Sequence, residues 1–337
     1  MSTKFTTVYA ETDDGLRLAV VDVTNPAFAV SVTAAELDAL ADRFVAETAN
    51  RPEMPPAVRA ALAQSILGKA LMAAAGGVLP GMDTYLLKLG PDQLTRPFTD
   101  VDRRIAASFP GYTTRIRLQD MARLIADGLA GALAADLDRP LCLINIAGGT
   151  ASDSWNALIH LHAEQPRLLA ARALSIAVLD PNDRGPRFGA RAVAALTAGG
   201  GPLGSLSVNV RHMMYDWSHA DRLAPLLDEL RARDAACAIS SEGGLFEYGS
   251  DEAIVANLEQ LHAGTPADTL VVGSVTRDGA PVRASQAATG VTTHPRTLDA
   301  FRALASGSGW RVGRVLERPF TYNVSLVKER EKASVQA

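Results

Sequence analysis

The residues best suited to ligand chemistry lie in one short segment, residues 141–158. Its apolar run Leu141–Ile146 is typical of a strand that is buried on both faces. The glycine pair 148–149 permits a sharp turn and lets a ligand approach the backbone without meeting a Cβ. Ser152 or Asp153 can then cap a helix whose free N–H groups point back toward the turn. Strand, glycine turn and helix start form a common nucleotide-binding corner. Since neither G-x-G-x-x-G nor a phosphate-binding lysine motif is present, an ordinary tight connection fits the segment equally well.

Polar side chains also follow the next three strand candidates along the chain. They are Asp180-Pro181-Asn182, then His212 with Tyr215-Asp216-Trp217, and then Ser240-Ser241-Glu242. Ligands of open α/β sheets bind at the carboxyl ends of the strands. The segment Ser240-Ser241-Glu242 lies at such an end and could form the polar rim of a pocket, although each of these segments could also be an ordinary capped loop.

The elements that must position these residues alternate between strand and helix from Arg139 onward, which is typical of a parallel sheet. A helix that follows Pro295 and two strands joined by a short turn close the chain. We predict a doubly wound α/β fold with a mostly parallel seven-stranded sheet and a C-terminal antiparallel hairpin. The strand candidates are Leu141–Ile146, Leu174–Leu179, Leu206–Val210, Ala235–Ser240, Thr269–Val275, Trp310–Leu316 and Thr321–Val327.

The residues before Arg139 are expected to form two further units. Residues 1–50 carry two short strand candidates, Thr6–Ala10 and Leu16–Val23, followed by a capped helix. A linker is predicted at residues 51–56. Residues 51–138 are mainly helical and fit a lid or a dimerisation region. In that region one helical face carries Val58, Leu62, Ile66, Leu67 and Leu71, and a last helix is predicted over Leu118–Leu133.

The composition narrows the class of protein. The 337 residues are 47% hydrophobic and 21% charged, with a net charge of −4. These values are typical of a globular protein and exclude a basic surface for nucleic acid. The apolar window 57–79 contains charged residues and glycines, so we read it as a buried helix rather than a membrane span. No signal-peptide pattern is present, and we expect a cytoplasmic protein. A homodimer is expected because dimers are the commonest oligomers.

The order of elements, with its glycine turn after the first strand, resembles the class I S-adenosylmethionine-dependent methyltransferases over residues 139–328. In that family the last strand is antiparallel and inserts into the sheet as a hairpin with the strand before it. The resemblance implies S-adenosylmethionine as the cofactor. It implies that the backbone of Asn145-Ile-Ala147-Gly148-Gly149-Thr150 passes beneath the methionine part. Asn145 replaces an acid that is frequent in the family, and a further glycine is absent.

The resemblance also implies roles for single residues. Asp180, with Pro181 and Asn182, would bind the ribose hydroxyls. Asp216 would accept from the adenine amine, with Tyr215 or Trp217 beside the base, and Ser240 and Ser241 would belong to the rim of the pocket. Arg115, in a segment expected to precede the last helix, could pair with the carboxylate of the methionine moiety.

Methyl transfer from a sulfonium is a direct displacement, so the main task of such an enzyme is alignment. Only an OH or NH acceptor needs a base, for which His212, His219, His294 and Glu242 are the candidates. No metal is expected, because His160 and His162 face different sides of a helix. The acceptor is expected to be a small molecule that the sequence does not identify.

Two other functions fit the same sequence. One is a methyltransferase-like binding or assembly module without catalysis, which the altered glycine turn favours. The other is a nicotinamide-dependent oxidoreductase, which would also use a glycine turn and an acidic residue but more often carries G-x-G-x-x-G.

Overall fold

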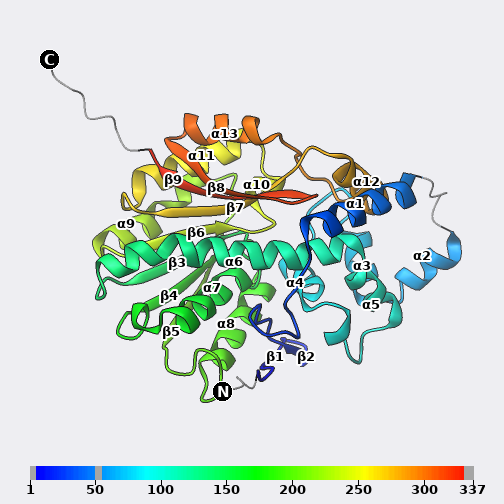
Figure 1. The fold of residues 1–337 in the computed structure, drawn as a ribbon, viewed down its shortest axis with the longest axis horizontal. Helices are drawn as coiled ribbons and strands as arrows, with labels where there is room; N and C mark the ends of the chain where they lie inside the picture. The colour runs from blue at the N-terminus through cyan, green and yellow to red at the C-terminus, as the bar shows by residue number, and fades with distance from the viewer. Residues whose placement is uncertain (1–4, 50–54, 330–337) are drawn as a thin grey trace.

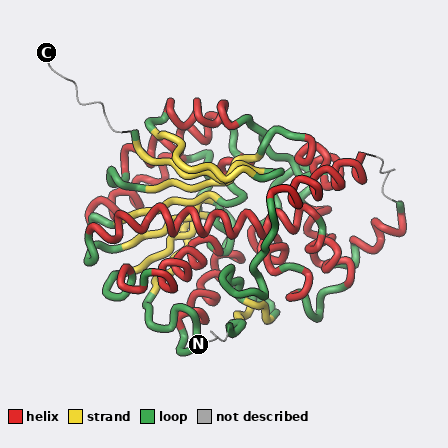
Figure 2. Tube along the Cα trace, viewed as in Figure 1, coloured by secondary structure: helices red, strands yellow, loops and turns green. Residues whose placement is uncertain are grey.

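A seven-stranded sheet runs through the centre of the molecule (Figures 1 and 2). The computed structural model describes residues 5–49 and 55–329, so most of the predicted linker lies outside the described residues. The strand order is β5-β4-β3-β6-β7-β9-β8. The strands are β3 (Leu141–Ile146), β4 (Leu174–Leu179), β5 (Val208–Met213), β6 (Ala236–Ser241), β7 (Leu270–Thr276), β8 (Trp310–Glu317) and β9 (Thr321–Lys328).

The direction of the strands confirms the predicted fold class. The β3 strand pairs in parallel with β4 and β6, placing Leu141 opposite Leu174 and Ala236. Only β9 is reversed, because it pairs antiparallel with both β7 and β8. The C-terminal hairpin therefore inserts its second strand into the sheet. Strand β5 begins two residues later than predicted, after a turn in which Leu206 donates its N–H to Leu203.

Helices cover both faces of the sheet, and each face has its own apolar core. One core includes side chains of α6, α7 and α8, whereas the other includes side chains of α9, α10, α11 and α13. These helices are α6 (Phe109–Ala135), α7 (Ser152–Glu164), α8 (Arg184–Thr197), α9 (Ala224–Ala232), α10 (Leu245–Tyr248), α11 (Asp251–Gly264) and α13 (Leu298–Gly307). Short 3₁₀ turns occur at η1 (Pro91–Gln93), η2 (Pro166–Leu168) and η3 (Ala220–Leu223).

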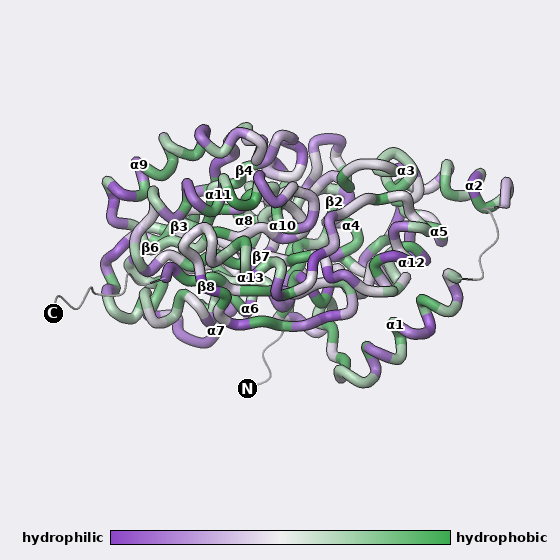
Figure 3. The backbone as a smooth tube through the Cα atoms, turned by 90° about the horizontal axis from the view of Figure 1, so that it is seen from above, coloured by the Kyte–Doolittle hydropathy of each residue, from purple (hydrophilic) through white to green (hydrophobic). Residues whose placement is uncertain are grey.

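Further helices gather at the right-hand end of the molecule in Figures 1 and 3. They are α1 (Ala34–Ala49), α2 (Pro56–Leu62), α3 (Ile66–Ala73), α4 (Gly81–Leu89), α5 (Asp100–Ala107) and α12 (Ala280–Thr289). The single helical face predicted from Val58 to Leu71 is wrong. The helix breaks before Ser65, whose Oγ caps α3 by accepting from the Gly68 N–H. Val58 is 46% exposed and does not belong to the core.

The start of α6 also differs from the prediction. The helix begins at Phe109, where the Oγ of Ser108 accepts from the N–H of Gly111 and Pro110 occupies the first turn. Pro is favourable there, because the first N–H groups of a helix have no intrahelical partner. Arg115 therefore lies inside a helix and not in a loop before it. None of the described helices is long and apolar enough to cross a membrane.

The N-terminal segment fixes α4 against the sheet domain. It forms a two-stranded sheet from β1 (Tyr9–Glu11) and β2 (Arg17–Ala19). The hydroxyl of Tyr85 on α4 donates to the Ala19 carbonyl and accepts from the Val21 N–H. The Val21 carbonyl also accepts from the indole N–H of Trp155 on α7. These buried bonds set the position of α4 beside the start of α7. The division of the chain into three units, with boundaries at residues 50 and 138, stays a prediction.

Candidate functional site

A cavity of about 350 Å³ opens at the carboxyl ends of β3, β4 and β6. It lies where the chain order of the strands reverses on either side of β3, the place at which open α/β sheets bind ligands. Its volume falls within the usual range of small-molecule sites. The lining residues are Val78, Leu79, Pro80, Gly81, Thr84, Lys88, Ala147, Gly148, Gly149, Asp180, Pro181, Asn182, Asp216, Trp217, Glu242 and Gly243.

The turn between β3 and α7 has an unusual backbone. Ala147, Gly149 and Ala151 have positive φ angles of 54°, 51° and 59°. Such angles are strained for alanine, and backbone strain of this kind gathers at functional sites. The close approach at Gly149, predicted for a ligand, is made by protein backbone instead. A Cβ on Gly149 would lie 2.8 Å from the Cα of Gly81, at the start of α4. The turn still lines the cavity beside this contact.

Asp180 lies at the end of β4, directly beside the glycine turn. Its Oδ2 accepts from the Gly149 N–H at 2.9 Å, and its Oδ1 accepts from the Asn182 N–H at 2.8 Å. Burial raises the pKa of this carboxyl above its ordinary value, although the two backbone donors oppose the shift. Each carboxylate oxygen has a second lone pair, so both can still accept from a ligand.

The loop after β5 contributes Asp216 and Trp217 to the cavity. Asp216 is exposed, and its Oδ1 accepts from both the N–H and the hydroxyl of Ser218. These bonds lower its pKa, so it remains ionised. Tyr215 points the other way. It is buried in the core with its hydroxyl 2.5 Å from Oδ1 of Asn257, and it is absent from the lining.

A buried network of charges forms the wall of the cavity beyond the end of β6. The Nζ of Lys88 lies 2.5 Å from Oε2 of Glu242 and donates to the Oγ of Ser152 at 2.9 Å. The Arg117 Nε lies 2.9 Å from Oε1 of Glu242, and its Nη1 lies 3.0 Å from Oε1 of Glu247. Burial alone would raise the pKa of Glu242, but Lys88 and Arg117 lower it below its ordinary value. Two cations thus neutralise two anions.

Lys88 is the basic residue that the sequence analysis missed. Arg115, which was predicted to pair with the carboxylate of a methionine moiety, lies elsewhere. Arg115 packs against Gly90, where a Cβ would lie 3.0 Å from its Cζ, and it does not line the cavity. The helix α4 brings Lys88 to the glycine turn because it docks on that turn through Gly81. The only sequence signal was the Pro80-Gly81 pair, which marks a helix start.

Four further predicted residues are packed behind the cavity wall and do not line it: Asn145, Thr150, Ser240 and Ser241. The Nδ2 of Asn145 donates to Oδ1 of Asp153 at 2.7 Å and to the Oγ of Ser240 at 2.6 Å. Burial, and then the neighbouring charge of Glu242, raise the pKa of Asp153. Asn145 thus lies beside a buried acid from α7.

The candidate bases are dispersed. His212 lies behind Asp180, with its Nε2 2.8 Å from the Asp180 carbonyl oxygen. His219 and His294 are exposed, and none of the three histidines lines the cavity. Only Glu242 does so. Within residues 5–49 and 55–329, no group of three His, Cys, Asp or Glu side chains could hold a metal ion.

No protein-family model matches this chain, and no curated protein is similar to it in sequence. Solved structures are similar in fold. A possible exported protein from Bordetella parapertussis is 17% identical, with 89% of this chain and 98% of that one covered and a TM-score of 0.56.

Two further structures match with lower TM-scores. Magnesium protoporphyrin IX methyltransferase from Synechocystis PCC 6803, solved with S-adenosylhomocysteine, is 14% identical, covers 74% of this chain and 94% of its own, and has a TM-score of 0.45. LepI, in complex with S-adenosylmethionine, is 13% identical with a TM-score of 0.39, and the match covers 61% of this chain and 46% of LepI. The strand order and the single reversed strand β9 carry the assignment: the chain has the fold of the class I S-adenosylmethionine-dependent methyltransferases.

Proposed function

We propose that the protein binds S-adenosylmethionine in the cavity beside β3 and transfers its methyl group to a small-molecule acceptor. The observation that carries this proposal is the placement of Asp180, Asp216 and Trp217 around one cavity at the point where the strand order reverses. A carboxylate for ribose hydroxyls, an acceptor for an adenine amine and an aromatic face are the groups that a nucleoside requires.

The charged wall supports the same ligand. An α-amino acid end carries one carboxylate and one ammonium. The Lys88–Glu242 pair offers the opposite charges side by side at the glycine turn. A ligand with this end could pair its carboxylate with Lys88 and its ammonium with Glu242, so no charge would be buried unpaired. A nicotinamide dinucleotide lacks that end and carries a pyrophosphate, for which the cavity offers Lys88 as its one lining cation.

S-adenosylmethionine held by Asp180, Asp216, Lys88 and Glu242 would supply an activated methyl group. The contribution of this chain is alignment and exclusion of water. Glu242 is a weak proton acceptor because its pKa is lowered by two cations. We therefore propose that Glu242 holds the cofactor and does not act as the general base predicted from the sequence.

Isothermal titration of the protein with S-adenosylmethionine, S-adenosylhomocysteine and NADH in parallel tests the proposal. Micromolar binding of the two sulfur ligands, with NADH inert, is the expected result. Binding of NADH alone would make the protein an oxidoreductase. Binding of both sulfur ligands without methyl transfer in an acceptor screen would favour a binding module. The structural argument for such a module is that no candidate histidine base lines the cavity.

A further inference from the structure

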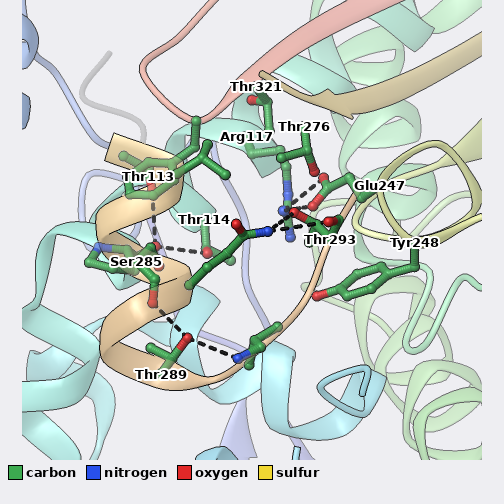
Figure 4. A pocket seen from close by; sticks show the side chains of 15 residues that line it. Thr113, Thr114, Arg117, Glu247, Tyr248, Thr276, Ser285, Thr289, Thr293 and Thr321 are labelled. Atoms are coloured by element: carbon green, nitrogen blue, oxygen red, sulfur yellow. Dashed lines mark hydrogen bonds and ion pairs between the residues drawn. The ribbon is translucent and has the colours of Figure 1, made fainter. Parts of the chain in front are cut away.

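A second cavity, of about 130 Å³, lies between α6, α10, α12 and the ends of β7 and β9 (Figure 4). Its walls are rich in hydroxyl groups. The threonines that line it are Thr113, Thr114, Thr276, Thr289, Thr293 and Thr321. Ser285, Gln286 and Tyr248 add further neutral polar groups. The hydroxyl groups of Thr113, Thr114, Thr289 and Thr321 donate to oxygen atoms of the protein, so they are acceptors toward a ligand, and the lining carries no net charge.

One of these hydroxyls has no partner. The Oγ1 of Thr276 is buried and makes no hydrogen bond within the described part of the chain, and Thr276 is 4% exposed. An unsatisfied buried hydroxyl is unfavourable, whereas a ligand with a hydroxyl or carbonyl group would satisfy it. Figure 4 places Thr276 beside Arg117 and Glu247.

The two charged side chains beside Thr276 neutralise each other. Arg117 and Glu247 are the charged residues of the lining, and they are paired with each other at 3.0 Å. The cavity is slightly smaller than an engineered cavity of about 150 Å³ that holds benzene. A head group of about one ring, uncharged and able to hydrogen-bond, fits these walls.

An apolar groove of about 780 Å³ continues from this cavity across α1, α2 and α5. Pro110 and Thr289 line both spaces. Three half-buried phenylalanines mark the junction, because Phe320 lines the cavity whereas Phe44 and Phe109 line the groove. Their ring centroids are 5.4–6.0 Å apart. The charged residues of the groove are Arg43, Glu47 and Arg104, and the remaining lining is mostly apolar.

The hydroxyl-lined cavity also adjoins the proposed cofactor site. Arg117 lines it, and the same guanidinium pairs with Glu242 and lies close to Gly243, where a Cβ would come within 2.7 Å of its Nη2; Glu242 and Gly243 both line the first cavity. One side chain thus separates the two spaces. We propose that the acceptor is an uncharged amphipathic molecule, with a polar head of about one ring in the hydroxyl-lined cavity and an apolar chain in the groove. The role of this molecule as methyl acceptor rests on the proposed function, whereas its binding site can be tested independently.

The probes are two homologous series, 5-alkylresorcinols and 1-O-alkylglycerols with chains of one to eight carbons, used below their micellar concentrations. Binding is followed by NMR of selectively labelled threonine methyl groups, since six threonines line the cavity. In at least one series, we expect shifts at Thr276 and Thr289 and an affinity that rises roughly twofold to fourfold per methylene. No binding by either series, or an affinity independent of chain length, would overturn the proposal.

Two variants distinguish the binding of the polar head from the binding of the apolar chain. Thr276→Val should weaken every member of the bound series roughly threefold to tenfold. Its control is Thr269→Val, because Thr269 is equally buried and unpartnered but precedes the other end of β7 and lines no cavity described above. Val58→Asp should flatten the dependence on chain length, whereas Leu137→Asp, at an equally exposed apolar residue outside the groove, should not. Equal effects of variant and control would contradict the assignment.

The same samples are titrated with S-adenosylhomocysteine. Binding of that ligand without the probes would retain the proposed function and reject the amphipathic acceptor. Binding of the probes alone would retain the second site and reject methyl transfer.

Discussion

Gly81, the first residue of α4, packs backbone to backbone on Gly149, in the turn after β3, so that a Cβ on Gly149 would lie 2.8 Å from the Cα of Gly81. The contact joins two segments far apart in sequence. It also sets the distance at which Lys88, two turns further along α4, meets Glu242. The floor of the cavity and its charged wall therefore depend on this glycine contact together with the buried hydrogen bonds of Tyr85.

Gly81→Ala should force α4 away from the turn. We expect a loss of about 1–3 kcal/mol in the free energy of unfolding, the usual effect of overpacking, together with weaker ligand binding. Gly131→Ala is the control, since Gly131 lies in α6 with open space around it. That change should increase stability by roughly 0.5–1 kcal/mol. Urea unfolding of both variants measures the difference in free energy of unfolding. Equal stabilities of the two variants would contradict the claim that Gly81 is needed for close packing.

Asp180→Ala should weaken binding of S-adenosylhomocysteine by roughly 1–3 kcal/mol, the scale of hydrogen bonds to a charged group. Asp183→Ala is matched to it, because Asp183 lies three residues on, pairs with Arg187 at the surface and does not line the cavity. Isothermal titration compares the two. An unchanged affinity in a folded Asp180→Ala protein would reject the ribose assignment.

Lys88→Met and Glu242→Gln test the buried ion pair. Each single change leaves a buried charge with fewer partners and should cost about 3 kcal/mol in unfolding free energy. The double variant should cost less than the sum of the two, with a coupling of at least about 1 kcal/mol, as is usual for residues in direct contact. Denaturation curves of all four proteins give this value. Strict additivity would mean that the pair contributes nothing as a unit.

Asp153→Asn should change how stability depends on pH. Burial raises the pKa of Asp153 in the folded protein above its unfolded value. The contribution of Asp153 to the free energy of unfolding is therefore fully present below its pKa in the unfolded chain, about 4. This contribution is lost as the pH rises through its pKa in the folded protein. The variant cannot ionise there, so its stability relative to wild type should increase from pH 4 toward pH 8. Urea unfolding of both proteins across that range tests the sign, and a relative stability of the variant that stays constant or falls would contradict it.

The sheet was predictable because its signals are local. The runs Leu141–Ile146 and Leu174–Leu179 are continuous apolar segments, and the structure gives both strands the predicted bounds. The acid at the end of β4 was found for the same reason, since Asp180 follows its strand directly. The start of α6 was not predicted, although Ser108 as the cap and Pro110 in the first turn are local signals for it.

The charged wall was not predictable in this way. Lys88 and Glu242 are 154 residues apart, and nothing near either residue indicates the other. Their contact depends on how α4 docks, which is decided by tertiary packing at Gly81. The burial of Tyr215 has a similar cause, because its partner Asn257 comes from α11.

The most direct test of the central claim is a crystal structure of the protein grown with S-adenosylhomocysteine. The account predicts that the ligand lies in the cavity beside β3, with its ribose hydroxyls at Asp180, its adenine between Asp216 and Trp217, and its amino acid end at Lys88 and Glu242. A cavity that stays empty at millimolar ligand, or a ligand bound elsewhere on the protein, would contradict it.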